Sequence, residues 1–134
     1  MNPTTPTQWM EVGNQRAADA IAIHSKRENS VGSFYLVGYA IECSLKAYLL
    51  TRRTPVPTHG RAGHDLRELW KASQLRLQDL NDGDGCKAFY LFSWSTNYRY
   101  SLVFQCAHSK NTLIKRAQEL TGWIQTLVRR RLRR

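Results

Sequence analysis

Apolar residues recur along much of the chain at steps of three and four positions, the spacing of one face of an α-helix. The pattern predicts a first helix over about 7–27 and a last helix over about 111–132. It also predicts a short helix over 66–70, one or two turns over 75–80, and a helix over 86–94. Only the last of these segments, which is rich in aromatic residues, has strand as a competing interpretation.

The segment 31–53 is the most apolar of the chain and predicts a central helix with neighbours on several sides. Glu42 and Lys46 alone interrupt its apolar surface, and they stand four positions apart in the order that favours a helical ion pair. They form a pair within the core, lie on a face that reaches solvent, or face a ligand cleft between helices. Gly32 and Gly38 lower helix propensity, so we expect them at close helix contacts.

Helix boundaries are marked by residues of the expected types. Ser30 is suited to cap the N-terminus of the central helix, and Pro55 and Pro57 are expected to end it. Asp65 followed by Glu68 predicts a capping pair at the next helix.

These elements and their short connections predict an all-α fold, an antiparallel up-down bundle of four to five helices. A chain of 134 residues of which 42% are hydrophobic can bury one core without metal or disulfide. We therefore expect a single domain over 1–134, with a flexible 1–6 and a basic tail at 129–134.

The charge balance is unusual. Lys and Arg number 20 against 10 acids, which gives a net charge of +10. This excess favours contact with polyanions: nucleic acid, nucleotides, anionic lipid or an acidic protein. Five arginines lie within 129–134, and this tail either contacts a polyanion or only keeps the protein soluble.

Several site classes are not indicated. The three cysteines are widely spaced without CxxC, so neither a zinc site nor a redox pair is suggested, and Cys43 and Cys106 are expected to be buried. In the loop 81–85, Asp84 occupies the position where a calcium loop needs glycine. The polar start and the lack of a long apolar run predict no signal peptide and no membrane partner. We expect a cytoplasmic protein without a metal or other cofactor.

The four histidines form no HExxH motif or tight cluster. His24 lies near the apolar stripe of the first helix, so we expect it to be a core histidine. His59 and His64 flank a glycine-bearing loop that either binds phosphate or is simply solvated. Farther on, aromatic residues surround Arg99 between Trp94 and Tyr100, which predicts a nucleic-acid surface or packed aromatics with one snorkelling arginine.

The sequence GYAIECSLKAYL at 38–49 resembles the second-helix signature of the HEPN domain family. His64-Asp65-Leu66, Arg99-Tyr100 and a last long helix over 113–128 follow in the order and spacing of that family. The resemblance implies a bundle of four long antiparallel helices, frequently a homodimer, and a link to nucleotides or RNA. It implies three kinds of member: metal-independent RNase toxins, often paired with a minimal nucleotidyltransferase, inactive proteins and ligand-binding accessory domains.

The RNase branch of that family carries an arginine, four to six residues and then a histidine near the start of the last helix. Arg99 stands where the arginine belongs, but residues 104–106 fill the histidine position. His108 comes nine positions after Arg99, about two and a half turns, which places the two on opposite faces of a regular helix. The standard motif is therefore absent.

The leading hypothesis is a homodimeric HEPN-like module that binds nucleotide or RNA. Arg99 would hold phosphate, and Tyr100 and Trp94 would stack on the ligand or line its site. Charge and hydrogen bonds would come from three further residues: Glu42, Lys46 and His64.

Two alternatives stay open. In the first, the protein is a metal-independent RNase toxin in which Arg99 clamps the transition state and His108 or His64 is the general acid–base. In the second, it is a structural partner of a nucleotidyltransferase without catalytic activity.

Overall fold

The computed structural model describes residues 2–28, 30–56, 64–94 and 108–134, and all regular secondary structure in these ranges is helical. The elements, in chain order, are α1 (Pro6–Lys26), α2 (Val31–Thr51), α4 (Leu66–Ser73), the 3-10 turn η1 (Leu77–Asp79), α5 (Cys86–Ser93) and α6 (Lys110–Leu132). The all-α prediction is confirmed, and the aromatic-rich segment that begins at Cys86 is a helix rather than a strand. No helix in the described part is long and apolar enough to cross a membrane.

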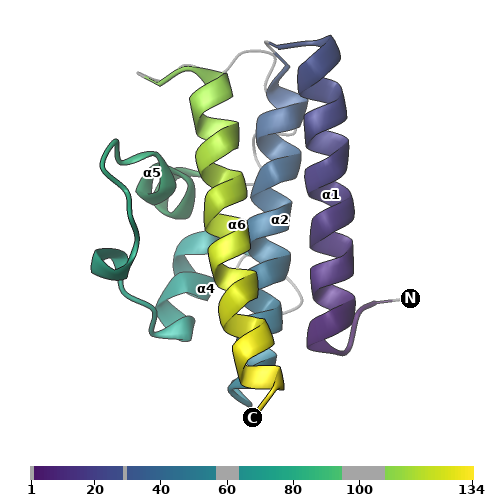
Figure 1. Cartoon of the computed structure of the whole chain (residues 1–134), viewed down its shortest axis with the longest axis vertical. Coiled ribbons are helices and arrows are strands. Elements are labelled where there is room, and N and C mark those ends of the chain that lie inside the picture. Colours follow the sequence, from purple (N-terminus) through teal and green to yellow (C-terminus); the bar gives the residue numbers. More distant parts are fainter. Residues whose placement is uncertain (1, 29, 57–63, 95–107) are drawn as a thin grey trace.

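Three long helices, α1, α2 and α6, lie side by side, and α4 and α5 cover one side of them (Figure 1). α1 and α2 run in opposite directions, whereas α2 and α6 run in the same direction. Between α2 and α6, the chain passes through α4 and then α5, which lies above α4 in this view. α2 packs against α1, α6 and α4, which confirms the prediction of a central helix.

α2 is central because it is apolar around most of its circumference: 15 of its 21 residues are buried. Its first turn is capped as predicted, since the Ser30 hydroxyl accepts a hydrogen bond from the Gly32 N–H. Its end differs from the prediction. The helix ends at Thr51, before either proline, because Arg53 adopts a left-handed conformation with φ 57°. The N–H groups of Arg53 and Thr54 then bond the carbonyls of the last turn, as in a Schellman motif.

Gly38 lies where the indole ring of Trp94 packs against α2. A Cβ atom at position 38 would overlap that ring. Trp94 is 4% exposed, and its Nε1 donates to the carbonyl oxygen of Tyr35 at 3.2 Å. The predicted close contact at Gly38 is thus confirmed. The same prediction for Gly32 is wrong, because a Cβ there would meet only the Ser30 hydroxyl of its own helix cap.

The acidic loop before α5 caps that helix and ties it to α6. The Asp82 carboxylate accepts from the N–H groups of Lys87 and Ala88 at 2.9 and 3.0 Å. Asp84 accepts from the Cys86 N–H at 3.0 Å and from Arg116 Nε at 2.7 Å. Asp82 thus accepts from backbone donors, and Asp84 accepts from one backbone donor and one guanidinium donor.

The Asp84 contact predicts a specific loss of stability in acid. The hydrogen bond from Arg116 holds the pKa of the Asp84 carboxyl well below its ordinary value of 3.8. Its contribution to stability is therefore present above that ordinary value and is lost as the pH falls below it. We expect Asp84→Asn to lower the Tm at pH 7, and the gap to the unmodified protein to narrow at pH 3. Thermal unfolding at both pH values checks this, and a gap of constant size would contradict it.

Candidate ligand cavity between α1 and α2

A cavity of about 390 Å³ opens between α1 and α2. This is within the size range of sites for small organic ligands, roughly 300–1,000 Å³. Its lining comes from the segment before α1, from α1, from α2 and from the residue preceding Asp65: Asn2, Pro3, Trp9, Val12, Arg16, Leu36, Tyr39, Glu42, Cys43, Lys46 and His64. The cavity therefore joins an apolar and aromatic wall to several charged groups.

Helical spacing explains why these side chains share one space. On α1, the lining positions are 9, 12 and 16, and on α2 they include 36, 39 and 43, the steps that stack side chains on one face. The two helices come close at Gly13, where a Cβ would lie 3.1 Å from the Cys43 Cβ and 3.3 Å from the Ala40 oxygen. This close approach brings the two lining faces together.

The polar part of the cavity is a buried ion pair joined by a half-exposed histidine. The Lys46 ammonium lies 3.0 Å from Glu42 Oε2, and His64 Nδ1 lies 3.2 Å from Glu42 Oε1. The side chains of Lys46 and Glu42 are 2% and 4% exposed, whereas His64 is 42% exposed. Glu42 and Lys46 thus form an ion pair within the core, which confirms one of the three interpretations left open by the sequence, and the pair also lines a cavity.

The position of His64 is set by the start of α4. Asp65 is the N-cap of α4, and its carboxylate accepts from the Arg67 N–H at 3.0 Å, as its sequence position predicted. His64, one residue earlier, reaches Glu42 of α2. The capping turn at the start of α4 therefore places the half-exposed His64 imidazole at the cavity.

Two cations beside the cavity retain unused hydrogen-bond donors. The Lys46 ammonium also lies 4.9 Å from the centre of the Trp9 ring, a cation–π contact. Arg16 pairs with Asp19 at 3.2 Å, but its buried Nε has no hydrogen-bond partner within the described structure. A buried donor without a partner is costly, and an acceptor on a ligand would satisfy it.

Aromatic rings form the wall nearest His64. The Tyr39 ring stands edge-on to His64 and to Trp94, with ring centres 6.4 and 5.4 Å apart. Its hydroxyl lies 2.7 Å from that of Tyr35. Trp94 packs behind Tyr39 and does not line the cavity. In this arrangement Trp94 supports the wall, whereas Tyr39 presents its ring to the space.

Cys43 does not act as a nucleophile here. Burial, and secondarily the neighbouring Glu42 carboxylate, raise the pKa of its thiol to about 12. The thiol is therefore protonated at neutral pH, and the thiolate is the reactive form. The sequence-based expectation that Cys43 is a buried apolar residue is confirmed; Cys106 lies outside the described residues.

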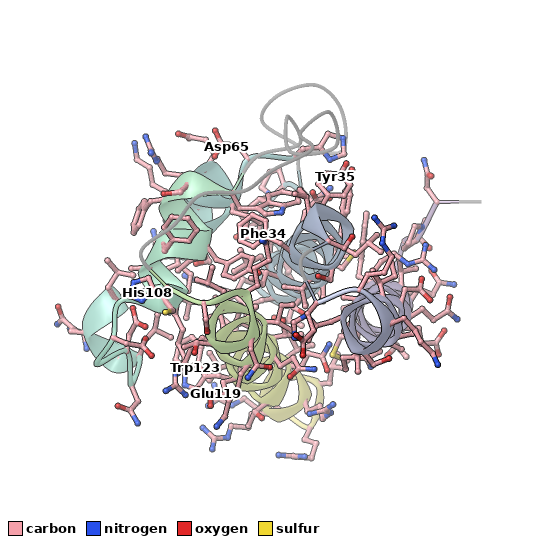
Figure 2. All side chains as sticks on the ribbon, turned by 90° about the horizontal axis from the view of Figure 1, so that it is seen from above. Phe34, Tyr35, Asp65, His108, Glu119 and Trp123 are labelled. Atoms are coloured by element: carbon pink, nitrogen blue, oxygen red, sulfur yellow. The ribbon has the colours of Figure 1, made fainter. Side chains whose placement is uncertain are left out.

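The structure brings together three of the predicted site residues, Glu42, Lys46 and His64. Arg99 and Tyr100, like His59, lie outside the described residues. His108 immediately precedes α6 and lies on the α5 side of the molecule, away from α1 (Figure 2). It is therefore separate from the cavity.

The predicted core histidine, His24, is half-buried at the contact of α1 with α6. Its Nε2 lies 3.3 Å from Asn111 Oδ1, and its Nδ1 is buried without a hydrogen-bond partner among the described residues. The prediction of a core histidine is therefore wrong, because the side chain is half-buried and does not belong to the buried core.

Sequence reasoning missed Trp9, Arg16 and Tyr39. The signal was present on the first helix, because Trp9 and Arg16 are seven positions apart and share a face with Val12. It is obscured because Arg16 is charged and does not belong to the apolar pattern that predicts the first helix.

Comparisons of the chain with protein-family models, with curated protein sequences and with solved structures find no match.

Proposed function

We propose that this protein is a binding module that holds a nucleotide in the cavity between α1 and α2. The observation that carries the proposal is the presence, in one cavity, of cations with unused donors and half-buried aromatic rings. Arg16 and Lys46 provide the cations, and Trp9 and Tyr39 provide the rings. In a chain of net charge +10, an anionic ligand with a planar ring suits this combination.

The cavity contains a group suited to each part of a nucleotide. Guanidinium and ammonium groups bind phosphate by charge-assisted hydrogen bonds, and the fork of Arg16 can engage two oxygens at once. Aromatic side chains stack on the planar bases. A volume of about 390 Å³ suits one nucleotide better than a strand, which would need an open groove.

The HEPN-like second-helix sequence at 38–49 supports the same proposal, since it includes four of the five α2 residues that line the cavity. A homodimer and an association with a nucleotidyltransferase follow from that resemblance, as does an up-down HEPN-like arrangement, and they stay proposals. For the RNase alternative, His108 is separate from the cavity and Arg99 lies outside the described residues, whereas His64, the other candidate general acid–base, lines the cavity.

The test is isothermal titration of the purified protein with adenosine, guanosine, cytidine and uridine monophosphates, and with inorganic phosphate. We expect binding of at least one nucleotide to weaken about tenfold or more in Arg16→Gln, because a charge-assisted hydrogen bond contributes about 1.5–3 kcal/mol. The matched control is Arg76→Gln. Arg76 also pairs with an aspartate three positions on, at 3.2 Å, but it does not line the cavity.

Other outcomes would decide against the proposal. Equal losses in both arginine variants would show that only net charge matters. Binding of inorganic phosphate as tight as that of every nucleotide would remove the role of the rings. Metal-independent cleavage of a mixed-sequence RNA, lost in Arg99→Ala, would instead establish the RNase.

A further inference from the structure

The positive charge of this chain is concentrated in two segments without acidic residues. Residues 43–64 and 120–134 together contain nine Lys and Arg and no Asp or Glu. The rest of the chain contains eleven Lys and Arg and ten acids. The two segments therefore account for nine of the ten units of net charge.

The first segment contains the C-terminus of α2 and the second contains the C-terminus of α6, and the fold places these two helix ends together. α2 and α6 end at the same end of the molecule, the lower end in Figure 1. Their ends are in contact, since the Arg131 guanidinium carbon lies 5.9 Å from the centre of the Tyr48 ring. The result is an arginine patch of five exposed residues and the half-buried Arg131: Arg53, Arg129, Arg130, Arg131, Arg133 and Arg134.

The protein itself does not neutralise this patch. Among the ion pairs of the described residues, none joins a patch arginine to a carboxylate. The C-termini of α2 and α6 contribute about half a negative charge each, roughly one unit against six arginines. Arg129 and Arg133 also stand four positions apart on a helix, where like charges repel. Most of the positive charge of the patch is therefore left for a partner outside the chain to neutralise.

We infer that the arginine patch binds the sugar–phosphate backbone of a nucleic acid without reading its sequence. Guanidinium groups match the geometry of phosphate oxygens and dominate backbone contacts of this kind. An interface with a protein normally has an apolar centre. Here Leu132 is the one exposed large apolar side chain within the described residues of α6, so the patch is better suited to phosphates than to a folded partner.

The experiment measures the fluorescence anisotropy of a labelled single-stranded RNA of about 20 nucleotides, and of DNA of the same sequence, between about 50 and 200 mM salt. Each neutralised phosphate contributes about 0.7 to the slope of log K against log salt for a single strand. We expect the slope to fall by about 2 in the triple variant Arg130→Gln, Arg133→Gln, Arg134→Gln. The control triple, Lys26→Gln, Arg27→Gln, Lys115→Gln, removes the same charge from exposed positions elsewhere and should change the slope much less.

The inference does not depend on the nucleotide cavity, because none of the patch arginines lines it. Equal loss in the two triple variants would overturn it, because net charge alone would then explain binding. If polyglutamate displaced the labelled strand as effectively as unlabelled RNA does, the patch would instead be assigned to binding an acidic polypeptide. Absence of binding at low salt would leave the arginines only a structural role at the helix ends. Circular dichroism of both triple variants confirms that each is folded.

Discussion

Replacing Lys46 with methionine will destabilise the fold by about 3–5 kcal/mol, the usual cost of leaving one member of a buried ion pair without its partner. Glu42 is 4% exposed, and once the ammonium is removed its carboxylate keeps only the half-exposed His64 imidazole as an ion-pair partner among the described residues. Glu42→Leu leaves the Lys46 ammonium buried with only the Trp9 ring beside it, and we expect a loss of similar size. Urea unfolding followed by circular dichroism measures both.

The double variant Glu42→Leu with Lys46→Met separates the ion pair from the general effect of substitution in a core. It removes both charges, and well-packed apolar replacements of a buried pair are often neutral. We therefore expect a loss far below the sum of the two single losses. The exposed pair of Arg76 and Asp79 is the control, because exposed pairs contribute about 0–1 kcal/mol. Additive losses at positions 42 and 46 would contradict the prediction.

Gly38→Ala will destabilise the protein by about 3 kcal/mol although alanine is the better helix former. The new Cβ would overlap the Trp94 indole, and overpacking of a core costs about 1–3 kcal/mol. Displacing the ring also breaks its hydrogen bond to the Tyr35 carbonyl, which contributes about 1 kcal/mol. Denaturant unfolding measures the loss.

Gly122→Ala is the matched control for this substitution. Gly122 lies within α6, and a Cβ at this position would meet nothing within 4 Å. Helix propensity then acts alone and should stabilise the protein by up to about 1 kcal/mol. If both variants were stabilised, the contact between Trp94 and Gly38 would not hold in solution.

The fold was largely predictable because helical periodicity is local. The central helix, its Ser30 cap and the close contact at Gly38 were each expected from a few neighbouring residues. The end of α2 was not, because the left-handed turn at Arg53 replaces the glycine that usually marks it. Nor did the sequence indicate that Trp94 is the residue that fills the space above Gly38, since such pairings depend on the packing of distant segments.

The site was predictable only where one helix carries it. Glu42 and Lys46 are adjacent on α2, and their polarity in an apolar helix pointed to them. Arg16 and Trp9 became visible only once α1 was placed opposite α2. The cavity is formed by two helix surfaces, and the apolar periodicity of one helix does not indicate which face of α1 packs against which face of α2.

The position of α1 has a consequence for access to the cavity. α1 packs extensively on α2 but touches α6 at few places, among them the Asn14–Gln125 hydrogen bond at 2.9 Å. Partial release of α1 would expose the cavity while α2, α4, α5 and α6 keep their shared core. In such an architecture, backbone amides of α1 exchange with solvent sooner than those of α2. Under the proposed function, the ligand would then enter the cavity by the same motion that partly releases α1 from the bundle.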